Sequence, residues 1–218
     1  MRPEIKFCGM TREEDVAAAV ALGAEYVGVV FAGGPRTVPL TLARDLMSRV
    51  PRGVTRVGVF GREPHLGSPG DVAQSVGLDV VQLHGDPDEA TVDEVRRTFA
   101  GPVWAALRVQ GTSLPARAAA LFRVADAVVL DAYSATFLGG TGLALSWNEL
   151  AAGVAAVRAT GRLVLAGGLR AETVSAAVGV LQPDIVDVSS GVESAPGIKD
   201  HLKLKAFRDA VRGEGRAL

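Results

Sequence analysis

Short apolar runs alternate along the chain with longer segments in which apolar residues recur at helical spacing. The short runs are rich in Val, Ile and Leu, and they predict strands at Ile5–Cys8, Tyr26–Phe31, Thr55–Phe60, Val80–Leu83, Val103–Leu107, Ala127–Asp131, Arg162–Ala166 and Ile185–Val188. The longer segments predict helices at Arg12–Leu22, Leu40–Val50, Gly70–Val76, Asp88–Phe99, Leu114–Phe122, Asn148–Thr160, Arg170–Leu181 and His201–Val211. Thr11 is the expected N-cap of the first helix.

Strands that are apolar on both faces are typical of a parallel sheet covered by helices. A strand followed by a helix, repeated about eight times, predicts an α/β fold of the (β/α)₈ TIM barrel type. No linker or low-complexity segment interrupts the alternation, so residues 1–218 are expected to form a single domain. An open doubly wound sheet is the structural alternative.

Composition excludes several classes of binding partner, metal site and cellular location. Of 218 residues, 48% are hydrophobic and 22% are charged, and the net charge of −1 gives no reason to expect binding to nucleic acid or to an acidic membrane surface. A single cysteine excludes an intramolecular disulfide and a cysteine-rich metal site. No apolar run approaches the length that spans a bilayer, and the first residues lead into a strand without a signal-peptide region. We therefore expect a cytoplasmic protein.

The ends of the predicted strands carry the candidate chemistry, as they do in barrel enzymes. The last two strands end in small residues, in the segments Leu165-Ala166-Gly167-Gly168-Leu169 and Val188-Ser189-Ser190-Gly191. Small residues let a ligand approach the backbone, where N–H groups can hold an anion. Two such loops side by side would form a phosphate site, although ordinary strand-to-helix turns would have the same composition.

Two reactive side chains stand at the ends of other strands. Cys8 closes the first predicted strand beside Gly9, and a thiol needs only a modest change of environment to become a base or nucleophile. Asp131 ends the otherwise apolar sixth strand. Together they could act as a base and an acid across a barrel mouth. The structural alternatives are a packed small side chain for Cys8 and a loop-capping carboxylate for Asp131.

Three cationic or ionisable residues accompany them. Arg36 follows Gly33-Gly34-Pro35, and its planar fork of donors suits a carboxylate or phosphate, although it could instead be a solvated surface arginine. Lys6 is expected to face the barrel interior with Cys8, where it would need Asp131 or Asp187 as a partner. His84 has no assigned role.

An ordered set of motifs resembles a known family over nearly the whole chain. The motifs are Lys6-Phe7-Cys8-Gly9-Met10-Thr11, Gly34-Pro35-Arg36, Val57-Gly58-Val59-Phe60, Gln82-Leu83-His84-Gly85, Leu130-Asp131, Gly139-Gly140-Thr141-Gly142, Leu165-Ala166-Gly167-Gly168-Leu169, Val188-Ser189-Ser190-Gly191-Val192-Glu193 and Pro196-Gly197-Ile198-Lys199-Asp200. In this order they resemble the phosphoribosylanthranilate isomerase family of tryptophan biosynthesis.

The resemblance implies a barrel enzyme that needs neither a metal nor an organic cofactor. It implies an Amadori rearrangement of N-(5-phosphoribosyl)anthranilate to 1-(2-carboxyphenylamino)-1-deoxyribulose 5-phosphate. It also implies that Cys8 is the general base, that Asp131 is the general acid and that Arg36 binds the anthranilate carboxylate. The implied phosphate site consists of Gly167, Gly168, Ser189, Ser190 and Gly191. A monomer or a homodimer is expected.

Two other functions remain open at this point. One is a related phosphosugar barrel enzyme, such as indole-glycerol-phosphate synthase or the isomerase of histidine biosynthesis; the latter is expected to have an acidic residue where this chain has Cys8. The other is a non-enzymatic barrel that senses a phosphorylated metabolite, which would need neither a base nor an acid.

Overall fold

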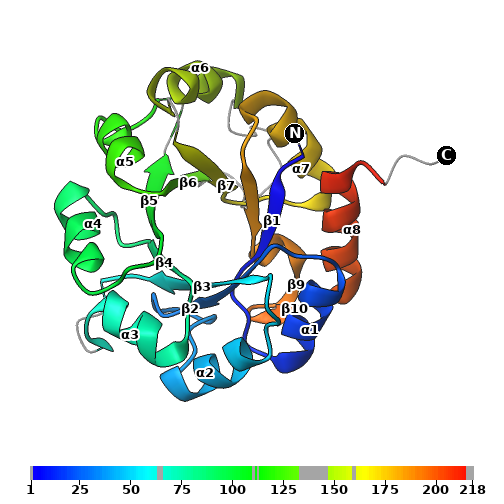
Figure 1. The fold of residues 1–218 in the computed structure, drawn as a ribbon. Coiled ribbons are helices and arrows are strands. Elements are labelled where there is room, and N and C mark those ends of the chain that lie inside the picture. The colour runs from blue at the N-terminus through cyan, green and yellow to red at the C-terminus, as the bar shows by residue number, and fades with distance from the viewer. Residues whose placement is uncertain are drawn as a thin grey trace.

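The computed structural model describes residues 2–62, 66–109, 111, 113–132, 147–158 and 161–214. Eight parallel strands form a closed barrel in the order of the sequence, and the helices surround it (Figure 1). The strands are β1 (Glu4–Phe7), β2 (Tyr26–Val30), β3 (Thr55–Phe60), β4 (Val80–Leu83), β5 (Val103–Val109), β6 (Ala127–Ala132), β7 (Arg162–Ala166) and β8 (Ile185–Val188). The last strand pairs with the first, Ile5 opposite Val186, and this pairing excludes the open doubly wound sheet.

Each barrel strand is followed by a helix. The helices are α1 (Glu13–Ala21), α2 (Leu40–Ser48), α3 (Pro69–Val76), α4 (Glu89–Arg96), α5 (Ala118–Val124), α6 (Trp147–Arg158), α7 (Ala171–Leu181) and α8 (His201–Arg212). Between β8 and α8 lie a 3₁₀ turn, η2 (Ser190–Val192), and a two-stranded hairpin, β9 (Glu193–Ala195) with β10 (Ile198–Lys199). None of the described helices is long and apolar enough to cross a membrane.

The sequence predictions differ from the structure mainly at the ends of elements. β1 ends at Phe7, so Cys8 is the first residue after the strand, although its N–H still donates to Val188 O at 2.9 Å. Thr11 does not cap α1, because its hydroxyl donates to Gly197 O instead. α5 begins at Ala118 rather than at Leu114, because a residue before proline disfavours helical backbone. The glycine motif at residues 139–142 lies outside the described residues.

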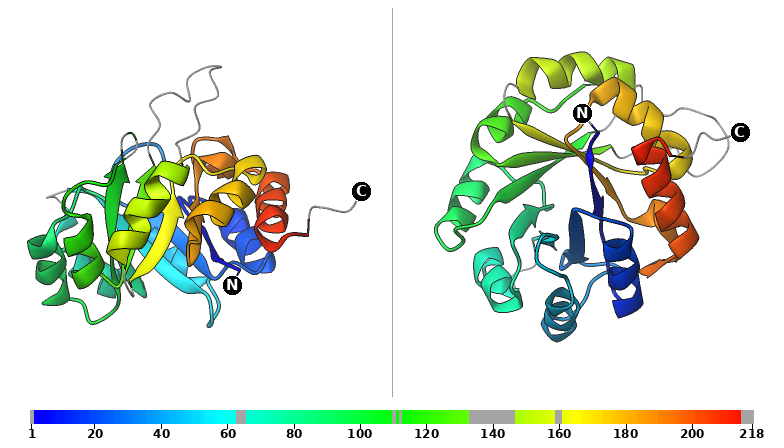
Figure 2. Two further views of the ribbon diagram at one scale, coloured as in Figure 1. Left: turned by 90° about the horizontal axis from the view of Figure 1, so that it is seen from above. Right: turned by 45° about the vertical axis from the view of Figure 1, so that its right-hand side comes forward.

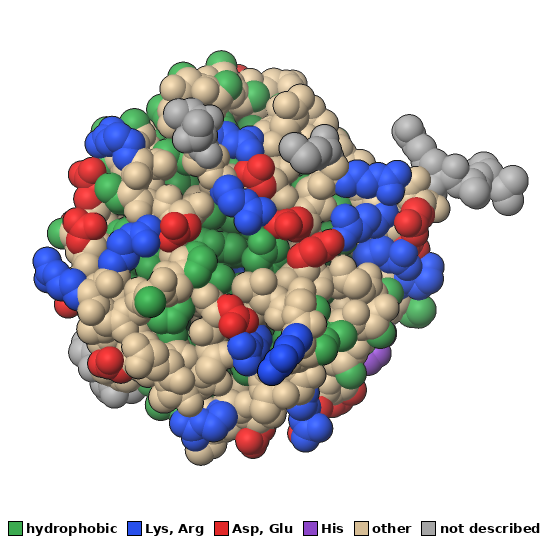
Figure 3. Space-filling view, in the orientation of Figure 1, with side chains coloured by type: hydrophobic (Ala, Val, Ile, Leu, Met, Phe, Trp, Pro, Cys, Tyr) green, Lys and Arg blue, Asp and Glu red, His purple; other side chains and the backbone are tan. Residues whose placement is uncertain are grey.

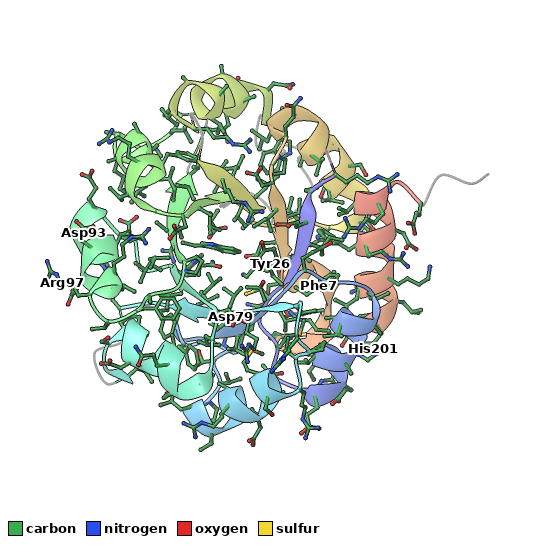
Figure 4. All side chains as sticks on the ribbon, in the orientation of Figure 1. Phe7, Tyr26, Asp79, Asp93, Arg97 and His201 are labelled. Carbon is green, nitrogen blue, oxygen red and sulfur yellow. The ribbon has the colours of Figure 1, made fainter. Side chains whose placement is uncertain are left out.

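Alternation along the strands produces two apolar layers. Inward-facing residues fill the barrel, and Tyr26 and Trp104 meet there with their rings 5.2 Å apart. Outward-facing residues pack against the helices, as Phe7 does against Phe207 of α8. Figure 4 shows Tyr26 inside the ring of strands and Phe7 on the side of β1 that faces α8. The filled interior makes the barrel a packed core and leaves ligand binding to the ends of the strands.

A repeated hydrogen bond closes the amino-terminal end of the barrel. The residue before each even-numbered strand of the barrel is acidic, and its carboxylate accepts the backbone N–H near the start of the preceding odd-numbered strand. We call these four carboxylates the amino-terminal clamps. Their bonds are Ile5 N to Glu25 at 2.7 Å, Arg56 N to Asp79 at 2.8 Å, Val103 N to Asp126 at 2.7 Å and Leu163 N to Asp184 at 2.6 Å. Each carboxylate also pairs with an arginine, and Figure 3 shows such opposite charges side by side on this end.

Candidate active site

A cavity of about 550 Å³ opens at the carboxyl ends of the strands, the end that points upward in the left view of Figure 2. Its volume is in the range of pockets that bind small metabolites. Its lining includes every residue that the sequence singled out for a site, namely Cys8, Arg36, Asp131, Gly167, Gly168, Ser189, Ser190 and Gly191. The fold therefore brings together side chains from the ends of β1, β6, β7 and β8 and from the loop after β2.

The two candidate phosphate loops lie against each other. Gly167 and Gly168 both have positive φ, 87° and 65°, which turns the chain sharply after β7. A Cβ at Gly191 would lie 1.9 Å from Leu169 O, so only glycine allows the second loop to approach the first this closely. The predicted pairing of the loops is confirmed as a geometric arrangement.

Cys8 lies at the floor of this cavity and is buried. Burial raises the pKa of its thiol, because desolvation penalises the thiolate, and the nearby charge of Lys6 offsets only part of this effect. Burial therefore disfavours the thiolate form of Cys8 in the unliganded protein. To act as a base, Cys8 needs nearby positive charges that stabilise its thiolate.

Lys6 faces the interior as predicted, and its partner is Asp187. Its ammonium lies 2.7 Å from Asp187 Oδ2, and both side chains are buried. Burial lowers the pKa of Lys6, but the Asp187 carboxylate and Cys8 outweigh burial and hold that pKa above its usual value. Lys6 thus carries a fixed positive charge inside the barrel, next to the candidate base.

Asp131 reaches the cavity from β6 and faces a histidine. His84 Nε2 lies 3.3 Å from Asp131 Oδ2, and the Asp131 side chain is 19% exposed. The carboxyl therefore contacts both a ring nitrogen and the cavity. His84, which the sequence left without a role, is the neighbour that orients it.

Arg36 is partly buried and has a carboxylate partner. Its Nε and Nη2 donate to the two carboxylate oxygens of Glu193 at 2.8 and 2.7 Å, and its side chain is 28% exposed. The buried ammonium of Lys199 donates to the same carboxylate at 2.9 Å and to Ser189 O at 3.2 Å. A chain of polar contacts thus joins the candidate carboxylate-binding arginine to the candidate phosphate loop.

Three buried polar atoms at the cavity have no hydrogen-bond partner among the described residues. They are Gln82 Oε1, His84 Nδ1 and Asp187 Oδ1. Buried polar atoms are normally satisfied, so these atoms are suited to a polar ligand. Gln82 was missed from the sequence, although a polar residue inside the apolar run Val80–Leu83 was a visible signal.

No group of three or more His, Cys, Asp or Glu side chains within the described ranges could hold a metal ion. The cavity instead combines one thiol, two carboxylates, the guanidinium groups of Arg36 and Arg170 and a pair of small-residue loops. This donor set suits an anionic, hydroxyl-bearing ligand and acid–base chemistry.

Comparisons with known proteins agree on one family. The sequence profile described as N-(5′-phosphoribosyl)anthranilate (PRA) isomerase matches residues 5–210. The chain is 42% identical over 214 residues to N-(5′-phosphoribosyl)anthranilate isomerase of Pseudomonas paraeruginosa, covering 97% of this chain and 96% of that protein. It is 37% identical over 210 residues to the isomerase of Caldanaerobacter subterraneus, covering 96% and 98%.

Solved structures give the same result. Phosphoribosyl anthranilate isomerase from Thermotoga maritima superposes with a TM-score of 0.83 at 35% identity, covering 97% of this chain and 99% of that one. A phosphoribosyl anthranilate isomerase in complex with reduced 1-(o-carboxyphenylamino)-1-deoxyribulose 5-phosphate superposes with a TM-score of 0.81 at 33% identity, with the same coverage.

Proposed function

The chain belongs to the N-(5′-phosphoribosyl)anthranilate isomerase family, and from this premise we propose how its residues divide the reaction. It is an isomerase of tryptophan biosynthesis. The proposal concerns the Amadori rearrangement of N-(5′-phosphoribosyl)anthranilate to 1-(2-carboxyphenylamino)-1-deoxyribulose 5-phosphate, with Asp131 as acid and Cys8 as base. The observation that carries the proposal is that one cavity is lined by the Cys8 thiol, the Asp131 carboxyl, the Arg36 guanidinium and the two small-residue loops after β7 and β8.

The first step opens the sugar ring. The anthranilate nitrogen forms a double bond to C1′ as the bond from C1′ to the ring oxygen breaks, and Asp131 gives that oxygen its proton. Asp131 must therefore be protonated when the substrate is bound. Its contact with His84 keeps its carboxyl directed into the cavity, where it can meet the ring oxygen.

The second step removes the proton on C2′. The iminium makes this proton acidic, the Cys8 thiolate takes it, and the electron pair forms the C1′–C2′ double bond while neutralising the nitrogen. The enolamine then tautomerises to the ketone, with a proton lost from the C2′ hydroxyl and one gained at C1′. No net oxidation occurs, so the rearrangement needs only proton transfers.

The two ends of the substrate are held apart from the reacting atoms. We assign the phosphate to Gly167, Gly168, Ser189, Ser190 and Gly191, and the anthranilate carboxylate to Arg36. Glu193 occupies the Nε–Nη2 edge of Arg36, which leaves Nη1 and the second hydrogen of Nη2 for a carboxylate. Binding energy from both ends then positions the sugar for the two transfers.

Variants of the two reacting residues test this assignment. We expect Cys8→Ala and Asp131→Asn each to lower kcat by at least about 10²-fold, the usual contribution of a positioned acid or base. Loss of anthranilate fluorescence with the phosphoribosyl substrate measures turnover, and circular dichroism checks that both variants fold. Near-normal turnover in both variants would refute the roles given to them. No turnover in the unaltered chain would favour a related phosphosugar enzyme or a metabolite sensor.

We also infer that residues 1–218 act as one barrel domain, as a monomer or a homodimer, without a cofactor. A structure of the Thermotoga maritima isomerase describes that protein as dimeric. Light scattering of the purified chain distinguishes the two states.

A further inference from the structure

The barrel contains a buried positive charge directly below the candidate base. The Lys6 side chain is fully buried in β1, two residues before Cys8, and its ammonium is held at 2.7 Å by Asp187 of β8. A charged lysine is costly to bury, so a fold that retains one inside its barrel needs a compensating gain. The pair is positioned differently from the amino-terminal clamps, because Asp187 lines the active-site cavity.

A glycine on the neighbouring strand brings the lysine and the thiol together. A Cβ at Gly28 of β2 would lie 2.9 Å from Cys8 Sγ and 3.3 Å from Lys6 Cε. The sulfur and the end of the lysine chain therefore both lie over the same backbone position. Any larger residue there would displace the thiol, so this contact depends on glycine.

Charged groups approach the thiol from several elements. Lys6 comes from β1, Asp187 from β8, Lys199 from β10 and Arg36 from the loop after β2. His84 and Asp131 line the same cavity from β4 and β6. Lys6 and Lys199 lower the pKa of the thiol and Asp187 raises it, and Lys6 is the strongest of the three influences after burial itself.

We propose that Lys6 is a positioning residue for the isomerase reaction, whose ammonium, fixed by Asp187, stabilises the Cys8 thiolate. The inference rests on the proposed role of Cys8 as base. It reduces the penalty that burial places on the thiolate, since a desolvated thiol without a nearby cation would ionise still more rarely at neutral pH. Lys6 itself is fully buried and does not line the cavity.

The single cysteine of the chain makes the test direct. Iodoacetamide alkylates the thiolate, forming a sulfur–carbon bond as iodide leaves, and every cysteine adduct, identified by peptide mass spectrometry, forms at Cys8. The midpoint of the alkylation rate against pH therefore reports the ionisation of Cys8 alone. The measurement needs no substrate, so it is independent of turnover.

Three variants should shift the alkylation midpoint by different amounts. Lys6→Met removes the cation and leaves Asp187 unpaired, so the midpoint should rise by about one unit or more, equivalent to about tenfold less thiolate at a given pH. Lys6→Met combined with Asp187→Asn removes both charges and avoids an uncompensated buried carboxylate, so it keeps the test available if the single variant does not fold. Its midpoint should lie between those of Lys6→Met and the unaltered chain. Lys205→Met, which removes an exposed lysine paired with Asp209, is the matched control and should leave the midpoint unchanged.

The midpoint of the folded double variant decides the outcome. An unchanged midpoint would overturn the proposal and leave Lys6–Asp187 as a structural ion pair. A raised midpoint, accompanied by a rise in the pH at which kcat/KM reaches half its maximum, would support it. Failure of the proposed function appears differently: Cys8→Ala would retain turnover while the alkylation midpoint still responded to Lys6.

Discussion

Glu193 determines how Arg36 meets a ligand. This carboxylate is buried between two cations, Arg36 and Lys199, and it accepts hydrogen bonds from both. Burial raises the pKa of Glu193, but Arg36 and Lys199 outweigh burial and hold that pKa below its usual value. The arginine is therefore fixed before a substrate arrives, which lowers the entropy cost of binding a carboxylate.

Replacing Glu193 by Gln should weaken substrate binding more than chemistry. The amide keeps the shape but loses the charge, so Arg36 is no longer fixed by a two-bond ion pair. We expect KM to rise about tenfold, equivalent to about 1.4 kcal/mol, with kcat within about twofold of its original value. Glu13→Gln is the matched control, because Glu13 pairs with Arg49 at the surface. A fall in kcat with unchanged KM would contradict this positioning role.

The sequence predicted which candidate residues line the cavity better than it predicted their partners. Cys8 and Asp131 were recognisable because reactive side chains stood at the ends of apolar runs, and Arg36 because it follows a glycine–proline loop. Their neighbours were not, because the contacts join distant segments: Arg36 and Glu193 are 157 residues apart, and Lys6 and Asp187 are 181 apart. The choice between Asp131 and Asp187 as the partner of Lys6 required the order in which the strands close the barrel.

At the scale of elements, prediction succeeded where burial governs the pattern. Four strands, Thr55–Phe60, Val80–Leu83, Arg162–Ala166 and Ile185–Val188, were predicted with their observed bounds, because buried strands have a strong apolar signal. The hairpin of β9 and β10 was not predicted, since three and two residues are too short to show a period. The four carboxylate clamps were also missed, because single acidic residues before strands resemble ordinary turn residues.

Removing one amino-terminal clamp should lower the stability of the protein without lowering its activity. Asp184 accepts the N–H of Leu163 at 2.6 Å and pairs with Arg158 at 2.6 Å, at the end of the barrel opposite the cavity. Asp184→Ala leaves the backbone donor without this acceptor, so we expect a loss of about 1–2 kcal/mol in the free energy of unfolding. Urea unfolding measures it, and kcat/KM should stay within about twofold. Asp93→Ala, an exposed position on α4, is the control and should change stability by less than about 0.5 kcal/mol. Equal stability of the two variants would show that the clamp contributes nothing.

For the whole molecule, the carboxylate clamps and the cavity lie at opposite ends of the same strands. The amino-terminal end holds backbone-binding carboxylates paired with arginines. The carboxyl-terminal end holds the cavity, where three buried polar atoms have no hydrogen-bond partner in the part of the chain that the structure describes. This division is the usual one for barrel enzymes. It allows an enzyme to keep buried charges and polar atoms without hydrogen bonds at the carboxyl-terminal end, where substrate binds. The carboxylates at the amino-terminal end meanwhile hold the barrel closed.

Acid should destabilise the protein through carboxylates at both ends. Burial raises the pKa values of Asp15 and Asp79, but hydrogen bonds from Arg12 to Asp15 and from Arg56 to Asp79 outweigh it, and both pKa values lie below their usual range, as does that of Glu193. A carboxyl whose pKa is lower in the folded state binds protons first in the unfolded chain. Its contribution is therefore complete above the usual pKa, about 4, and disappears as pH falls through the lowered value.

We accordingly expect the free energy of unfolding to be level between about pH 5 and 7 and to fall steadily below about pH 4. Urea titrations followed by tryptophan fluorescence at a series of pH values measure this profile. Asp79→Asn provides the internal comparison: it should be less stable than the unaltered chain at pH 7. The difference should shrink as pH falls below about 4 and through the lowered pKa of Asp79, because the carboxylate of the unaltered chain then becomes protonated. A difference that stays constant from pH 7 to pH 3 would mean that the Asp79–Arg56 ion pair does not contribute through its charge. A difference that shrinks would place part of the acid sensitivity of the barrel at its amino-terminal clamps, away from the residues to which we assign the reaction.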